Sequence, residues 1–149
     1  MSLPETHITD FIAEHHILNL AISRNDLPWC ATCYYAYLKD LNRFVITSDH
    51  DTRHIREVTE SGNYRVAGTI ALETKLVGKI RGIQFSGLLT TPEGDDLKTA
   101  KSAYLRRFPI ARLMPALHLW FVEPDFIKMT DNQLGFGKKL LWSAADTRN

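Results

Sequence analysis

Residues 29–47, WCATCYYAYLKDLNRFVIT, contain two strand-like runs joined by a polar turn. Trp29 to Leu38 is rich in aromatic and β-branched side chains, and Arg43 to Thr47 is a second run of the same kind. The polar residues between the two runs are typical of the tip of a hairpin. This stretch therefore predicts two adjacent antiparallel strands.

Alternating apolar residues elsewhere in the chain predict four more strands. Six antiparallel strands with a few helices, in a chain of 149 residues, favour a small closed or nearly closed barrel, because closure removes exposed strand edges. Gly82 and Gly87 lie inside one of these strands, where glycine often marks a bulge or a close backbone approach. The additional strands are expected at 17–23, 64–72, 80–90 and 117–122, the last extended by 126–130.

Three helices are expected around this sheet. Ser2 and Glu5 have capping-box spacing ahead of an N-terminal helix. Ile55 and Val58 form the apolar stripe of a short helix after the third strand, and a longer helix follows the fifth strand. The fold class predicted for residues 1–149 is thus mainly β (α+β), in a single domain with peripheral helices.

The composition indicates a folded protein with little net charge and therefore no strong overall electrostatic field. The apolar fraction of 44% and the charged fraction of 23% are typical of globular chains. Eighteen basic and seventeen acidic residues leave a net charge of +1, so no nucleic acid or membrane partner is expected. No segment approaches the ~20 apolar residues that cross a bilayer, and no secretory pattern opens the chain, so the expected location is cytoplasmic.

Cys30 and Cys33 form a C-x-x-C motif inside the second predicted strand. Such a motif can mark a redox dithiol or half of a zinc site. Positions three apart in a strand face opposite sides, and no second C-x-x-C is present to complete a zinc site. We therefore interpret the two cysteines as ordinary packing residues.

The densest polar cluster of the chain lies where the third strand gives way to a helix. Free backbone N–H groups and the helix dipole at such a junction favour an anion such as phosphate. A solvated surface helix is the alternative, because Asp49 and Asp51 would repel an anion unless they turn away. The side chains that could bind a phosphate here are Thr47, Ser48, Thr52, Arg53 and His54.

The same segment also raises the question of a metal. His50 and His54 are four residues apart, and they could share a metal only if one helix includes both. A helix that begins near Asp51 leaves His50 outside it, so no metal site is predicted. No nucleophile-elbow or Cys-His arrangement is present, so no catalytic residue is assigned, and the chemistry of an enzyme would fall to a bound cofactor.

Four segments are distinctive in combination: Thr52–His54, Ile80–Gly87, Ala103–Arg112 and Thr130–Lys139. Together they resemble the YhbP-type proteins, a family of small, functionally uncharacterised bacterial proteins, and the resemblance covers nearly the whole chain. That family is similar to the pyridoxamine 5'-phosphate oxidase-like split barrels, which are typically homodimers binding FMN in two clefts at the subunit interface. The resemblance therefore implies a six-stranded antiparallel split barrel, a homodimer and FMN.

The resemblance also implies where FMN would bind. In the oxidase, a threonine of the third strand and a Ser-Arg-Lys group four residues later hold the FMN phosphate. Here Ser48 takes the threonine position, and Thr52, Arg53 and His54 follow it. Histidine thus replaces a permanent cation with a group that is largely neutral at about pH 7.

Further contacts with the flavin follow from the resemblance alone. Residues 31–34 would lie along the flavin ring, and Lys138 or Trp142 would reach across the dimer. Gly82 stands where the oxidase has a glutamine that contacts the flavin. The substrate motif of the oxidase is missing, so that activity is not implied.

The leading hypothesis is an FMN-dependent oxidoreductase acting on an unidentified small molecule. One alternative is a barrel of the same fold without flavin, serving as a binding or interaction protein, which the residues His54 and Gly82 favour. The other alternative is haem binding through His50, His54 or His118.

Overall fold

The structure is a computed structural model that describes residues 2–145. Within this range the chain forms seven strands, three helices and three short 3-10 turns. The strands are β1 (Ile17–Arg24), β2 (Leu27–Leu38), β3 (Arg43–Thr47), β4 (Arg65–Ala71), β5 (Arg81–Thr90), β6 (Leu119–Asp131) and β7 (Lys139–Ser143). The helices and turns are α1 (Thr6–Glu14), η1 (Lys39–Leu41), α2 (Arg53–Ser61), η2 (Val77–Lys79), α3 (Gly94–Arg107) and η3 (Pro109–Leu113).

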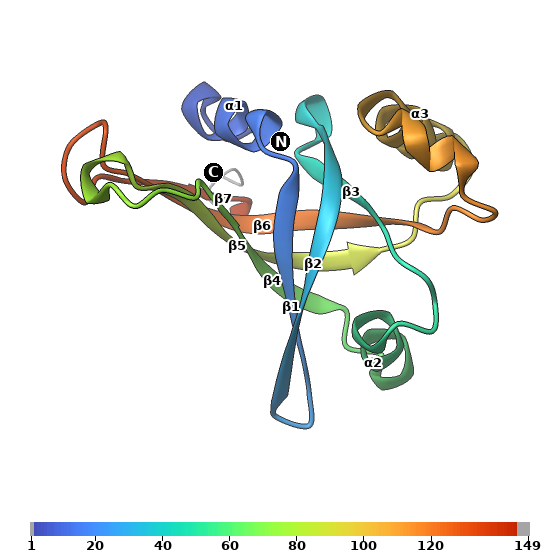
Figure 1. The fold of residues 1–149 in the computed structure, drawn as a ribbon. Coiled ribbons are helices and arrows are strands. Elements are labelled where there is room, and N and C mark those ends of the chain that lie inside the picture. The colour runs from blue at the N-terminus through green and yellow to red at the C-terminus, as the bar shows by residue number, and fades with distance from the viewer. Residues whose placement is uncertain (1, 146–149) are drawn as a thin grey trace.

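All strands belong to one antiparallel sheet in the order β3-β2-β1-β4-β5-β6-β7, which curves until β3 also pairs with β6 (Figure 1). One edge of β6 pairs with β5. The other edge pairs with β3 through Leu119–Val122 and with β7 through Phe126–Thr130. The barrel is therefore split along this edge of β6, between the segment that pairs with β3 and the segment that pairs with β7.

This architecture confirms the mainly β split barrel with peripheral helices. It corrects the number of strands from six to seven within the described residues, because residues 139–143 form β7. Sequence reasoning missed β7 because Leu140, Leu141 and Trp142 are consecutive apolar residues that do not alternate. The two expected pieces at 117–122 and 126–130 are one continuous strand, β6.

A bulge in β6 explains one of the strand glycines. Gly87 pairs with Pro124 and Ser86 pairs with Phe126, so Asp125 has no counterpart on β5. A Cβ atom on Gly87 would collide with the backbone carbonyl of Glu123. The predicted bulge with a close backbone approach is confirmed at Gly87.

Helix α1 closes one end of the barrel with three side chains that are fully buried, Ile8, Phe11 and Ile12. The expected capping box is wrong, because α1 begins at Thr6 with Glu5 as an N-cap that makes no side-chain hydrogen bond. The carbonyl of Ser2 instead accepts a hydrogen bond from the Trp142 indole, 3.3 Å away. The chain ahead of α1 is thereby held against β7.

Two apolar clusters hold the fold together. The larger fills the barrel and includes Leu20, Phe44, Phe85 and Trp120. The smaller lies beneath α3, where Val45 points to the opposite side of β3 from Phe44. Among the described helices, none combines the length and apolar character needed to cross a bilayer.

Candidate functional site

The polar cluster predicted from the sequence lies at the junction between β3 and α2. The carbonyl of His118 receives hydrogen bonds from the Thr47 hydroxyl, at 3.0 Å, and from the Ser48 N–H, at 3.1 Å. The N–H and the hydroxyl of Thr52 both bond to the carbonyl of Asp49, at 3.2 and 2.8 Å. This turn delays the helix, so Thr52 is the N-cap of α2 and none of residues 48–51 is.

Three of the predicted side chains meet in front of the first turn of α2. The Ser48 hydroxyl lies 2.6 Å from Nε2 of His54 and 3.2 Å from the Thr52 hydroxyl. The Trp120 indole fixes this position by donating to the Ser48 carbonyl at 2.9 Å. Burial lowers the pKa of His54 below its ordinary value of 6.5, so its ring is neutral at about pH 7. Thr47 does not join this group, because its hydroxyl bonds to the His118 carbonyl and makes no hydrogen bond to Ser48, Thr52 or His54.

Arg53 approaches the same junction from the start of α2. Its guanidinium stacks on the Trp29 ring, 3.9 Å from the centroid, and its Nε donates to Glu57 at 2.8 Å. Its two terminal nitrogens have no hydrogen-bond partner among the described residues. Glu57 could have been found from its i,i+4 spacing to Arg53, whereas Trp29 is brought there by the barrel.

Lys138 and Trp142 are not part of this group. Trp142 is 8% exposed and packs in the barrel core, so its ring is not open to a second copy as the sequence prediction required. Lys138 is exposed, and its carbonyl accepts the Asp131 N–H at 3.0 Å, at the far end of β6. The thirteen residues of β6 span about 40 Å, so Lys138 cannot approach Ser48 of its own chain.

The second-strand residues expected along a flavin ring alternate between the two faces of β2. Cys33 is buried, whereas Thr32 and Tyr34 are exposed. Cys30 is exposed, so the two cysteines face opposite sides as predicted. Burial raises the pKa of the Cys33 thiol to about 11, which keeps it protonated and unreactive at neutral pH.

His50 lies outside α2, so it does not share a helix face with His54. Its ring packs against the rings of His118, with centroids 4.5 Å apart, and of Trp120, at 5.3 Å. Among residues 2–145, no group of three or more His, Cys, Asp or Glu side chains is placed to hold a metal ion. These two histidines border a shallow pocket of about 460 Å³, which we call the β6-start pocket. It is lined by Asp49, His50, Asp51, Met114, Pro115, Ala116 and His118.

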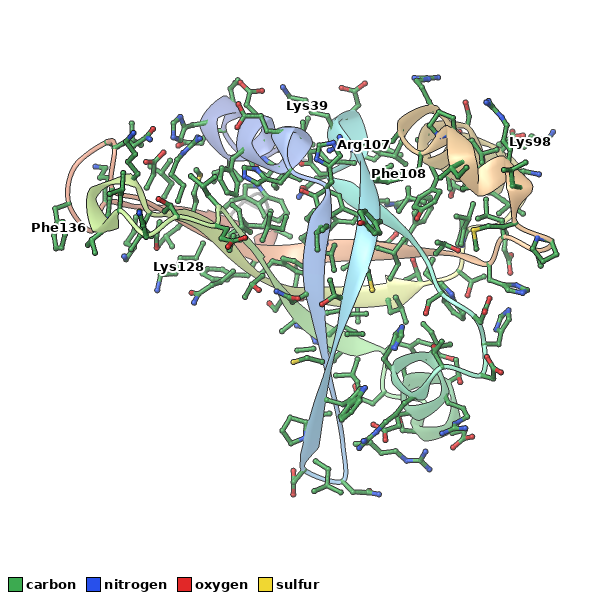
Figure 2. All side chains as sticks on the ribbon, viewed as in Figure 1. Lys39, Lys98, Arg107, Phe108, Lys128 and Phe136 are labelled. Carbon is green, nitrogen blue, oxygen red and sulfur yellow. The ribbon has the colours of Figure 1, made fainter. Side chains whose placement is uncertain are left out.

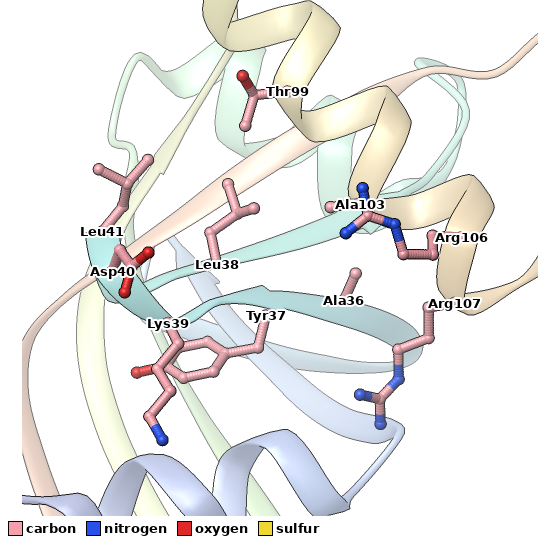
Figure 3. A pocket seen from close by; sticks show the side chains of 10 residues that line it. All are labelled: Ala36, Tyr37, Leu38, Lys39, Asp40, Leu41, Thr99, Ala103, Arg106 and Arg107. Atoms are coloured by element: carbon pink, nitrogen blue, oxygen red, sulfur yellow. The ribbon is translucent and has the colours of Figure 1, made fainter.

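Another pocket, of about 440 Å³, separates η1 from α3 and holds none of the predicted site residues (Figure 3). Lys39 at its edge is paired with Asp10 at 2.6 Å. Arg107 donates to the carbonyl of Ala13 at 2.8 Å and to that of His15, and so binds the end of α1. Arg106, the third cation of this pocket, donates only a long bond of 3.5 Å to the Ser102 hydroxyl. The β3–α2 junction is the stronger candidate for an anion because it combines an arginine with two hydroxyls and the N-terminus of a helix.

Solved structures define the class of this fold. A haem binding protein from Mycobacterium smegmatis superposes with a TM-score of 0.78 at 17% identity, over 96% of this chain and 60% of that one. A pyridoxamine 5'-phosphate oxidase-related, FMN binding protein from Nostoc punctiforme gives 0.67 at 13% identity, over 96% and 88%. An FAD binding protein from M. smegmatis gives 0.65 at 14%, over 85% and 93%. The fold is that of the pyridoxamine 5'-phosphate oxidase-like split barrels.

Sequence comparison then identifies the family. The chain is 41% identical over 132 residues to a UPF0306 protein of Klebsiella pneumoniae, covering 89% of this chain and 88% of that one. It is 39% identical over 137 residues to the UPF0306 protein YhbP of Salmonella arizonae, covering 92% and 91%. No protein-family model matches the chain. The chain belongs to the UPF0306 family, which includes the YhbP proteins, and the resemblance seen in its motifs is confirmed.

Proposed function

We propose that the protein binds FMN, with the phosphate at the β3–α2 junction. The observation that carries this proposal is the convergence of the Ser48 and Thr52 hydroxyls in front of α2. The first N–H groups of a helix lack acceptors within the helix and bind anions readily. The neighbours named as FMN and FAD binding proteins support a flavin on this fold.

The residues at the junction fit a phosphate monoester in the kind of their groups, with the Thr52 hydroxyl exchanging the Asp49 carbonyl for a phosphate oxygen. Arg53 is held by Trp29 and Glu57, and neither terminal nitrogen has a hydrogen-bond partner in residues 2–145, the arrangement that suits a charged oxygen. His54 adds a hydrogen-bonding nitrogen without a permanent charge. A bound flavin supplies two-electron chemistry, and the protein binds and orients it. We therefore propose a flavin-dependent oxidoreductase acting on a small molecule.

A second copy of the chain is the proposed partner, packed on the outer face of the sheet. The register lines up Thr32, Asn19, Thr69, Gln84 and Lys128 across five strands of this face. On the same face, Ala21 of β1 and Ala67 and Ala71 of β4 lie beside this row, so another sheet can approach closely. Exposed apolar residues flank the row. They are Ile17, Tyr34, Phe126 and Leu141.

Replacing Arg53 by alanine is expected to weaken FMN binding about tenfold, because the variant loses the permanent cation of the site. The measurement is quenching of FMN fluorescence during titration with protein. Arg56→Ala is the matched control, since Arg56 is an exposed arginine of the same helix. Equal affinities for the two variants would place the phosphate elsewhere. No binding by the wild type would favour the barrel without a cofactor.

The affinity for FMN is expected to depend on His54 as the pH falls. Because burial lowers the pKa of His54, its ring gains a proton only below the ordinary value of 6.5, and a bound phosphate favours that charged form. FMN itself loses negative charge in the same range, so the comparison must be with His54→Gln. From about pH 8 to about pH 5.5 the ratio of the two affinities should shift toward the wild type. A ratio of affinities that does not change with pH would show that His54 does not contact the phosphate.

Haem is a second candidate because His118 borders the β6-start pocket and one solved neighbour is named as a haem binding protein. A histidine that ligates haem iron must present a free ring nitrogen to it. Titration with haemin, followed by the absorption of the Soret band, tests this candidate in the wild type and in His118→Ala. A shift that disappears in the variant would favour haem over flavin.

A further inference from the structure

The loop of residues 132–138, which we call the Phe136 loop, is ordered and holds an apolar ring out into water. The Lys138 N–H bonds to the Gly135 carbonyl at 2.9 Å, and the Gly137 N–H bonds to Oδ1 of Asn132 at 2.9 Å. Gly135 and Gly137 have φ values of 146° and 70°, which side chains rarely allow. Between them Phe136 is 86% exposed and projects from the end of the molecule (Figure 2). An exposed aromatic ring carried on a hydrogen-bonded loop is typical of a docking contact where other apolar side chains are grouped with it.

The Phe136 loop is joined to the neighbouring β4–β5 connection. The Asn132 N–H bonds to the Ile80 carbonyl at 2.9 Å, and its side-chain amide bonds to the Val77 carbonyl at 2.8 Å. Together the two connections form an apolar tip with a basic rim. The exposed apolar members are Leu76, Val77, Ile80, Leu134 and Phe136. The rim lysines, which form no ion pair with any described residue, are Lys75, Lys79, Lys138 and Lys139.

The β6-start pocket has the complementary chemistry. Met114, Pro115 and Ala116 give it an apolar wall, and its volume of about 460 Å³ is ample for one aromatic ring. Asp49 and Asp51 stand at its edge, exposed, and neither forms an ion pair within the described part of the chain. Unpaired carboxylates beside an apolar wall suit an aromatic ring that is followed by lysines.

The strand β6 connects the loop and the pocket. It begins at Leu119, just after the pocket wall, and ends at Asp131, just before the Phe136 loop (Figure 1). A two-fold axis that crosses the middle of β6 lays a second copy antiparallel to the first. In such a dimer each loop would lie at the same end as the pocket of the other copy, and the contact would be made twice, as a closed dimer requires.

We propose that a second copy of this chain is the occupant of the β6-start pocket. In each half of the dimer, Phe136 of the partner subunit sits against Met114 and Pro115. Lys138 and Lys139 of the partner subunit face Asp49 and Asp51. The pocket and the loop are therefore two halves of one docking site.

This contact also bears on the phosphate site, and in that respect it rests on the proposed function. Asp49 and Asp51 are close in sequence to Ser48 and repel an anion at the junction. Lys138 of the partner subunit neutralises them, and it adds the second cation that the neutral His54 does not provide. The contact therefore adds positive charge beside the phosphate site.

The first experiment compares Phe136→Ser with the matched control Leu27→Ser, an exposed apolar residue at the tip of another hairpin. The dissociation constant of the dimer is measured by sedimentation equilibrium. Phe136→Ser should raise it at least about tenfold, because a buried aromatic anchor is lost, while Leu27→Ser leaves it near that of the wild type. Both side chains are exposed in the single chain, so thermal unfolding should show intact folds. Equal dissociation constants for Phe136→Ser and the wild type would overturn the proposal.

A cross-linking experiment locates the contact independently of flavin. In a Cys30→Ser background, Phe136→Cys combined with Met114→Cys should give a covalent dimer on mild oxidation, and Phe136→Cys combined with Leu27→Cys should not. A cross-linked dimer that binds no FMN would overturn the flavin proposal and leave this one standing. The wild type and Phe136→Ser are also tested for binding to phosphatidylglycerol vesicles. If the variant loses vesicle binding while its dimer is unchanged, the tip docks on lipid and the dimer proposal is overturned.

Discussion

Replacing Asp131 by alanine is expected to lower the free energy of unfolding by about 3 kcal/mol, as for the removal of one partner from a buried ion pair. Asp131 is 1% exposed. Its carboxylate lies 2.7 Å from Nε2 of His7 and 3.0 Å from Nε of Arg81, and it accepts the Gln133 N–H at 2.9 Å. The change therefore leaves three donors without their acceptor. It loosens α1, β5 and the Phe136 loop at once.

The cost of the Asp131 change should depend on pH. Burial alone would raise the pKa of Asp131, but hydrogen bonds from His7, the Gln133 N–H and Arg81 outweigh it and hold the pKa below its ordinary value of 3.8. The stabilisation is therefore complete above about pH 4 and is lost as the pH falls through the folded-state pKa. Urea unfolding should show the variant and the wild type converging in acid.

Asp10→Ala is the control for the Asp131 prediction. Asp10 forms an ion pair with Lys39 in which both side chains are about half exposed. Removing an exposed pair of this kind should cost no more than about 1 kcal/mol. If Asp131→Ala costs as little as Asp10→Ala, the buried network does not hold the loop and the helix together.

Replacing Gly87 by alanine is expected to destabilise the barrel by about 3 kcal/mol or more, because the added methyl group has no room. The new Cβ would collide with the carbonyl of Glu123, and it would lie 2.9 Å from Cα of Pro124. Both neighbours are backbone atoms of β6, so no side chain can rotate away. The strands β5 and β6 would have to separate beside the bulge at Asp125.

Gly82→Ala is the matched control for Gly87, because both glycines lie on β5. The nearest atom to a Cβ at Gly82 is the Ile70 carbonyl oxygen, at 3.3 Å. A small shift accommodates that contact, so Gly82→Ala should cost about 1 kcal/mol or less. Thermal unfolding of both variants measures the two losses of stability. Equal losses would show that the sheet can accommodate a methyl group at Gly87 without separating β5 from β6.

The candidate site could be predicted only in part from the sequence. Ser48, Thr52 and His54 were expected together because they lie within one short segment, where local geometry limits their separation. Arg53 was expected beside them, but its engagement by Trp29 was not. Lys138 and the β6-start pocket belong to opposite ends of β6, and their relation needs the length and direction of that strand.

The antiparallel barrel, its helices and the polar junction after β3 could all be recognised from local patterns in the sequence. Alternation, turn residues and short motifs act over a few neighbouring positions, so they can be recognised without the fold. Tertiary structure alone decided the seventh strand, the split along β6, the burial of Trp142 and the position of Trp29 under Arg53. These features depend on which strands pair and in what register, and pairing joins residues that are distant in sequence, so no local pattern records it.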